Sequence, residues 1–160
     1  MPYSICGLIV PEHEDLACAE SKWPFVRLAE QVALIPLDRD YLLLSDGDPT
    51  EAAEIHGWAS PQWLSQMVSR FSRSAYIEAE FWGGTGMQAS VVWEAGQITF
   101  GPEISTGAIN TALRRLGIAG GPAVSIHGLP LAPGRDPFDV VGLGRHRSVG
   151  GWLQEIAEHS

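Results

Sequence analysis

Two carboxylates interrupt the most strongly patterned stretch of this sequence, and their spacing limits what the stretch can form. The stretch YIEAEFWGGTGMQASVVWEAGQITFGPE, residues 76–103, sets Glu78 and Glu80 among apolar and aromatic residues and just before a GGTG segment. Alternate residues of a strand point to opposite faces, so both glutamates share one face of any sheet they join. They form either the solvent face of that sheet or an acidic site for a partner or substrate.

Turn residues divide this stretch into three strands, a meander. A two-residue hairpin at Ala95 and Gly96 predicts that Trp93 lies opposite Ile98, and the same register places Val91 opposite Phe100. The face that carries these four residues is predicted to be core.

The GGTG segment decides where the two glutamates point. A plain four-residue loop at 83–86 would put Glu78 and Glu80 on the side of Val91 and Trp93, buried and unpaired, at a cost of several kcal/mol. One bulged residue in this loop removes the conflict, so we predict a bulge there. The predicted core face holds Ile77, Ala79, Phe81, Ala89, Val91, Trp93, Ile98 and Phe100. The predicted outer face holds Tyr76, Glu78, Glu80, Trp82, Gln88, Ser90, Val92, Glu94, Gln97 and Thr99.

The remaining patterns predict a mixed fold in one domain, residues 1–160. Residues 3–10 are of strand type and end at Pro11, and residues 31–37 and 41–45 read as a hairpin. Helical spacing of apolar residues covers 60–71 and 109–116, where Gly117 ends the second helix, and a shorter helix is expected in the tail from 149. The prediction is an α+β fold, with an antiparallel sheet of about five or six strands packed on one side by two or three helices.

Negative charge is concentrated in the first part of the chain. The whole chain carries a net charge of −9, and residues 12–54 hold 11 acidic residues against 3 basic ones. Such a field repels phosphate backbones, which argues against nucleic-acid binding, and it attracts a basic protein partner. The alternative is that these acids only keep the protein soluble. The expected partner-binding residues are Asp38, Asp40, Asp46, Asp48, Glu78, Glu80 and Trp82.

Motifs of catalysis, metal binding and cofactor binding are sparse. No nucleophile elbow, HExxH or phosphate-binding loop is present, and the five histidines and two cysteines lack ligand spacing, so neither a metal nor a cofactor is expected. Arg145, His146 and Arg147 form the densest cationic cluster, which either binds an anion or pairs with Glu78 and Glu80.

The segment AYIEAEFWGGTGMQ, followed by INTALRRLGI and DPFDVVGLGRHR, resembles small uncharacterised bacterial proteins with an AYxEAE(aromatic)GGxGxQ segment. The resemblance covers residues 75–147, about half of the chain. In size and acidity the chain is also similar to the immunity proteins of bacterial toxin systems. That likeness implies a cytoplasmic protein that binds and neutralises a cognate toxin.

The expected function is therefore that of a non-enzymatic immunity protein, which binds a toxin with a basic surface through its own acidic surface. One alternative is a small hydrolase, in which one of Glu78 and Glu80 acts as acid and the other as base. A second alternative is a small-ligand-binding module. The sequence contains no apolar run of bilayer length and no secretory signal pattern, so the expected location is the cytoplasm and no membrane is involved.

Overall fold

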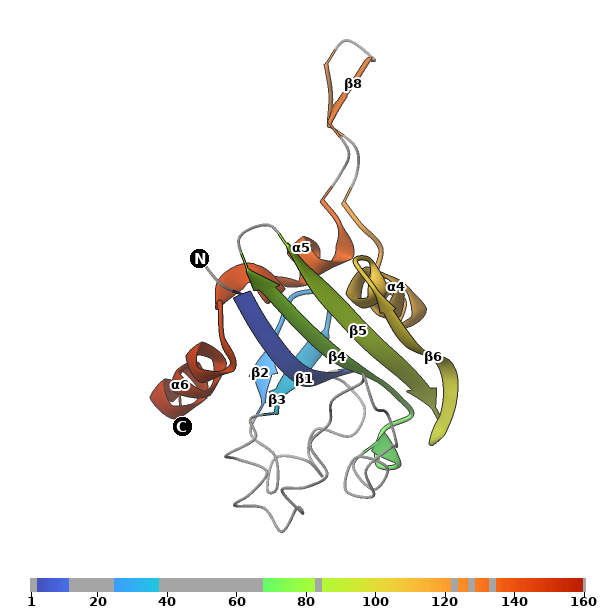
Figure 1. The fold of residues 1–160 in the computed structure, drawn as a ribbon, viewed down its shortest axis with the longest axis vertical. Helices are drawn as coiled ribbons and strands as arrows, with labels where there is room; N and C mark the ends of the chain where they lie inside the picture. Colours follow the sequence, from blue (N-terminus) through green and yellow to red (C-terminus); the bar gives the residue numbers. More distant parts are fainter. Residues whose placement is uncertain are drawn as a thin grey trace.

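Six antiparallel strands form one sheet in the described part of the chain (Figure 1). This computed structural model describes residues 3–11, 25–37, 68–82, 85–121, 124–126, 129–132 and 135–159. The strands lie in the order β2-β3-β1-β4-β5-β6. Their bounds are β1 Tyr3–Pro11, β2 Val26–Arg27, β3 Val32–Pro36, β4 Arg73–Trp82, β5 Thr85–Glu94 and β6 Gln97–Ser105.

The described helices all contribute to the core on one face of this sheet, here called the helix-covered face. They are α4 Ala108–Arg115, α5 Pro137–Val141 and α6 Val149–His159, with a 3-10 turn, η2 Leu143–Arg145, between the last two. Helix α4 packs on β4, β5 and β6, and α6 lies over β1, β2 and β3. Apolar side chains of both layers meet in this core, including Ile5, Ile9, Leu34, Ile77, Val92, Ile109, Leu113 and Trp152. The predicted α+β fold, with its helices on one side of the sheet, is confirmed.

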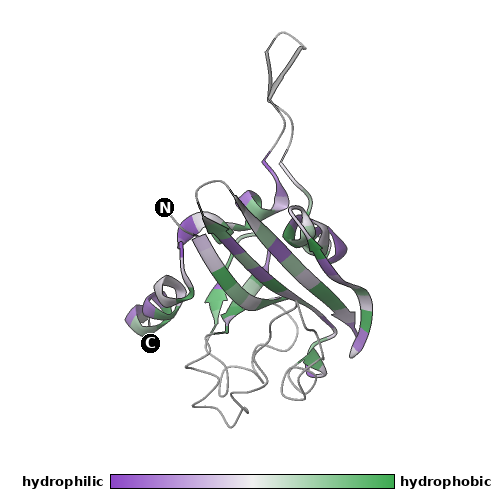
Figure 2. Cartoon of the chain, in the orientation of Figure 1, coloured by the Kyte–Doolittle hydropathy of each residue, from purple (hydrophilic) through white to green (hydrophobic). Residues whose placement is uncertain are grey.

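The opposite face of the sheet, here called the second face, is also largely buried. It carries its own cluster of buried residues, among them Leu8, Val10, Ile35, Val68, Phe71, Tyr76, Val91 and Trp93. The prediction of a solvated outer face that includes Tyr76, Ser90 and Val92 is wrong, since all three are fully buried. Tyr76 lies on the second face, whereas Val92 belongs to the core of the helix-covered face and the hydroxyl of Ser90 donates to the carbonyl of Ala108 in α4. Figure 2 shows hydrophilic and hydrophobic residues mixed along β4 and β5, as expected for strands that are neither wholly buried nor cleanly one-sided.

The pairing of β4 with β5 corrects the predicted bulge. The two strands pair without interruption from Arg73 opposite Glu94 to Trp82 opposite Thr85. This register puts the two glutamates on the second face, which also carries Val91 and Trp93. The bulge was inferred from the assumption that only one face of the sheet is buried, and the sheet buries both.

Irregular pairing occurs instead between β5 and β6. The turn at Ala95 and Gly96 is the predicted hairpin, and both residues have the left-handed conformation that such a turn requires, with φ of 50° and 77°. Trp93 does pair with Ile98, as predicted, but Phe100 pairs with Val92. The expected pairing of Phe100 with Val91 is wrong because extra residues in β6 shift the register twice, between Trp93 and Val92 and again before Ser90.

Other predicted elements lie partly outside the described residues. The strand at 31–37 is confirmed as β3, but its expected partner at 41–45 and most of the helix at 60–71 are not described. The helix at 109–116 is α4, and Gly117 follows it with φ of 92°. The tail helix is α6, with Trp152 fully buried.

A second, two-stranded sheet forms an arm. Its strands are β7 Val124–Ile126 and β8 Leu129–Ala132, and Figure 1 shows them extending away from the sheet beyond α4 and α5. At the root of the arm the N–H of Gly121 donates to the carbonyl of Arg135 at 2.7 Å. Asn110 of α4 holds α5 at this root, donating to Asp136 at 3.1 Å and accepting from the N–H of Phe138 at 2.8 Å.

Candidate functional site

The two glutamates lie at one end of the second face, where the buried surface gives way to an exposed one. Cys6 of β1, Glu78 of β4, Ala89 of β5 and Ile104 of β6 lie in one row across four strands. Partners in such a row share a face. The next row toward the end of the sheet holds Ser4, Glu80 and Met87. The sheet-end patch is defined here as Ser4, Cys6, Glu78, Glu80, Met87 and Ile104.

Exposure increases along the strands toward this end. Tyr76 is fully buried, Glu78 is half-buried and Glu80 is exposed, although all three point to the same face. Met87 and Ile104 are exposed to 44% and 45%. Among the described residues, the exposed large apolar side chains are these two and Ile98, and all three lie on the second face. The sheet-end patch therefore combines carboxylates with exposed apolar surface.

A buried phenol anchors the inner edge of the patch. The hydroxyl of Tyr76 donates to Oε2 of Glu78 at 3.3 Å and lies 3.1 Å from Sγ of Cys6. Burial, followed by the nearby Cys6 and Glu78, raises the pKa of Tyr76 well above its usual value. Tyr76 is therefore a neutral donor at physiological pH, and it orients the carboxylate of Glu78.

The predicted aspartates lie outside the described residues, but the point where their segment leaves the sheet is described. The N–H of Leu37 donates to the carbonyl of Cys6 at 2.9 Å, and Cys6 pairs with Glu78 in the next strand. The segment that carries Asp38, Asp40, Asp46 and Asp48 begins directly after Leu37. The acidic segment therefore begins one residue after Leu37, whose backbone is hydrogen-bonded to Cys6 of the sheet-end patch.

Charge is divided unevenly between the described residues and the rest. The described residues include 9 acidic and 8 basic ones, whereas the residues outside them include 10 acidic and 2 basic ones. The negative charge of the chain thus comes almost entirely from two segments, 12–24 and 38–67.

Trp82, another predicted contact residue, is described only by its backbone, which pairs with Thr85.

The cationic cluster has structural partners within the described chain. Arg145 and His146 contact the two carboxylate oxygens of Glu155 at 3.0 and 2.9 Å. The guanidinium of Arg145 lies over the ring of Trp152, and the ring of His146 meets that ring edge to face. The backbone carbonyl of Arg147 accepts from the N–H of Ser4 at 2.9 Å. These contacts fasten α6 and the segment before it to the start of β1.

Two local features bear on the enzymatic alternative. A carboxyl group that acts as a general acid is usually tuned by enclosure in a cleft, and Glu80 is exposed. The thiol of Cys6 lies 3.1 Å from the hydroxyl of Tyr76, which itself donates a hydrogen bond to the carboxylate of Glu78.

The described residues contain no group of three or more histidine, cysteine, aspartate or glutamate side chains placed to hold a metal ion. In the same part of the chain, no helix combines the length and the apolar character needed to cross a membrane. Comparison of the chain with known protein families, with curated proteins and with solved structures finds no match.

The sequence located Glu78 and Glu80 but missed Met87 and Ile104 as their neighbours. These two were missed because the predicted register turned Met87 away from the glutamates and ended the third strand before Ile104. The observed register is the one that follows when no bulge is introduced, since β4 and β5 pair regularly up to Trp82 and Thr85.

Proposed function

We propose that this chain is a non-enzymatic binding protein of the immunity type, which neutralises a cognate bacterial toxin in the cytoplasm. The proposed contact surface is the sheet-end patch together with the acidic segment that begins at Asp38. The toxin would carry a basic surface with an apolar centre.

The observation that carries the proposal is the open end of an otherwise buried sheet face, where Glu78 and Glu80 lie beside the exposed Met87 and Ile104. Protein interfaces combine an apolar centre with a polar rim, and methionine is enriched in them. Charged groups mainly guide the approach of a partner and exclude wrong ones, while packed apolar groups slow its release. The two kinds of residue in the patch thus have separable roles.

The test measures association and dissociation rates with the toxin candidate encoded beside this gene, by stopped-flow fluorescence from about 50 to 500 mM salt. We expect association to slow steeply with salt while dissociation changes little. Glu80→Lys should slow association at low salt by about threefold to tenfold. Charge reversal at Asp38, Asp40, Asp46 and Asp48 should have the same effect, whereas Met87→Ala should mainly accelerate dissociation.

The matched control is Glu158→Lys, the same charge change at an exposed residue of α6 on the helix-covered side of the sheet. It should leave both rates close to those of the wild type. An association rate that does not depend on salt would contradict the proposal, as would equal effects of the Glu80 and Glu158 variants. Either result would indicate that the acidic residues serve only to keep the protein soluble. A hydrolase activity that is lost in both Glu78→Gln and Glu80→Gln would favour the enzymatic alternative instead.

A further inference from the structure

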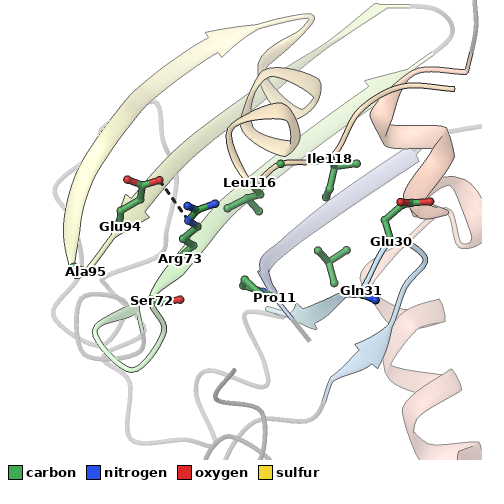
Figure 3. A pocket seen from close by; sticks show the side chains of 11 residues that line it. Pro11, Glu30, Gln31, Ser72, Arg73, Glu94, Ala95, Leu116 and Ile118 are labelled. Carbon is green, nitrogen blue, oxygen red and sulfur yellow. Dashed lines mark ion pairs between the residues drawn. The ribbon is translucent and has the colours of Figure 1, made fainter. Parts of the chain in front are cut away.

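A pocket opens at the opposite end of the sheet from the sheet-end patch, on the helix-covered face (Figure 3). Its volume of about 640 Å³ lies within the range of small-molecule sites. It lies between the turn that joins β2 to β3, the ends of β1 and β5, the start of β4 and the residues that follow α4. The lining residues are Pro11, Glu30, Gln31, Val32, Ser72, Arg73, Glu94, Ala95, Leu116, Gly117 and Ile118.

Unusual backbone conformations are concentrated around this pocket. Glu30, Gln31 and Ala95 have φ of 62°, 60° and 50°. They are all of the non-glycine residues with positive φ in the described part of the chain, and all three line the pocket. Ala95 adopts it in the β5–β6 hairpin, and Glu30 and Gln31 adopt it in the tight turn that joins the paired strands β2 and β3. The turn thus fixes the backbone of Glu30 and Gln31 at the rim of the pocket.

The ionisable groups of the pocket leave an excess of negative charge. Arg73 and Glu94 form an ion pair at 3.6 Å, with side chains exposed to 53% and 47%. Glu30 stands on the opposite wall, on the β2–β3 turn, as Figure 3 shows. Two carboxylates thus face one guanidinium, so the pocket favours a positively charged group near Glu30.

Apolar residues line the space between the two polar walls. Four of the lining residues are apolar: Pro11, Val32, Leu116 and Ile118. Val32 and Ile118 are almost fully covered by the core, so the half-buried Pro11 and Leu116 supply most of the accessible apolar surface. A ligand that fits both features has an apolar body and one cationic head. Pockets that combine apolar walls with a few polar groups bind small molecules of this kind.

We propose that this pocket binds a small organic cation, an amine on an apolar ring or chain, with its ammonium group at Glu30 and its apolar body against Pro11 and Leu116. The proposal goes beyond toxin binding and does not depend on it, because the pocket and the sheet-end patch lie at opposite ends of the strands. It also names a class of ligand for the alternative that the chain is a small-ligand-binding module.

Two probes of similar shape and opposite charge test the proposal: 2-phenylethylamine and 3-phenylpropionate. Each is titrated into ¹⁵N-labelled full-length protein, and amide shifts are followed by NMR. We expect saturable shifts with the amine, confined to residues 30–32, 72–73, 94–95 and 116–118, with a dissociation constant of the order of 1 mM. The carboxylate should bind at least about tenfold more weakly.

Three variants distinguish recognition of the ligand's charge from non-specific apolar binding. Glu30→Gln should weaken amine binding by about threefold to tenfold, as expected for one partly exposed ion pair. Arg73→Gln removes a competing cation and should strengthen amine binding. Glu158→Gln, a distant exposed control, should leave it unchanged. The same spectra report whether each variant is folded.

The proposal is overturned if the amine gives no saturable shift at the pocket residues. Equal binding of the two probes, or an unchanged amine affinity in Glu30→Gln, would also overturn it, because either result reduces the pocket to an apolar surface. None of these results bears on the salt dependence of toxin association, so the two proposals fail separately.

Discussion

Tyr3 and Tyr76 place one buried phenol on each face of the sheet. The hydroxyl of Tyr3 donates to the carbonyl of Leu143 at 3.0 Å on the helix-covered face, and that of Tyr76 bonds with Glu78 and Cys6 on the second face. Burial raises the pKa of both tyrosines well above the usual value of 10. Each phenol therefore keeps its proton in the folded state at a pH where the unfolded chain loses it.

Stability should consequently fall at alkaline pH. A raised pKa contributes stability that is complete below the unfolded value and is lost as pH rises toward the folded value. The free energy of unfolding should therefore be steady below about pH 10 and then fall by up to about 1.4 kcal/mol per pH unit for each tyrosine. Urea titrations between about pH 8 and pH 11.5 measure this slope.

Single phenylalanine variants identify the source of the slope. Tyr3→Phe should lose about 0.5–1.5 kcal/mol near pH 7, because its hydrogen bond is removed, and should show a shallower alkaline slope than the wild type. Tyr76→Phe should behave in the same way. An alkaline slope that is identical in the wild type and both variants would contradict the assignment.

Among the elements, the β7–β8 arm depends least on the rest of the fold. Gly121 and Arg135 already meet at its root, and Asn110 fixes α5 there independently of the arm. A Cβ at Gly120 would come within 2.7 Å of the carbonyl of Arg135, so a glycine is needed for this close approach. An isolated two-stranded hairpin is at best marginally stable in water, so the arm adds little to the stability of the body.

Removal of the arm should therefore leave the body folded. We expect replacement of residues 122–134 by Asn-Gly to change the free energy of unfolding by less than about 1 kcal/mol, since the closed root makes the new connection short. Asn110→Ala should cost about 0.5–1.5 kcal/mol, because it removes the part-buried hydrogen bond from the N–H of Phe138 and the exposed one to Asp136. Chemical denaturation compares the two variants. Loss of the folded state on excision alone would show that the arm is part of the core.

The sequence predicted elements where local chemistry specifies them, and failed where tertiary contacts decide. The Ala95–Gly96 turn, α4 and the strand nature of most of residues 76–100 follow from glycine positions and apolar periodicity. The face of Glu78 depends on whether the second face is covered, which no local pattern reveals. The pocket was missed because the left-handed turn at Glu30 and Gln31 has none of the residues typical of such a turn.

At the scale of the whole molecule, the same strands supply both cores. Leu8 and Ile9 are neighbours in β1, both fully buried, yet Leu8 belongs to the cluster on the second face and Ile9 to the helix-covered one. Neither cluster can lose its strands without exposing the other. The two clusters should therefore unfold together as one cooperative unit.

This cooperativity can be tested with a matched pair. Leu8→Ala and Ile9→Ala should each lower the free energy of unfolding by about 2–5 kcal/mol, as expected for large-to-small changes in a core. Both should retain a single transition, with the same midpoint by tryptophan fluorescence and by far-UV circular dichroism. Separate midpoints in either variant would show that the two clusters unfold independently.

The irregular pairing of β6 affects how this sheet meets other chains. In the described chain β6 is the outermost strand on its side, a position where another molecule could add a strand and start aggregation. Its two register shifts and Pro102, which has no N–H to donate, leave only short runs of regular backbone along that edge. Gly101 also carries φ of 84° there. A redesigned β6 that has the same amino-acid composition but pairs regularly along its whole length should therefore favour fibril growth from this edge.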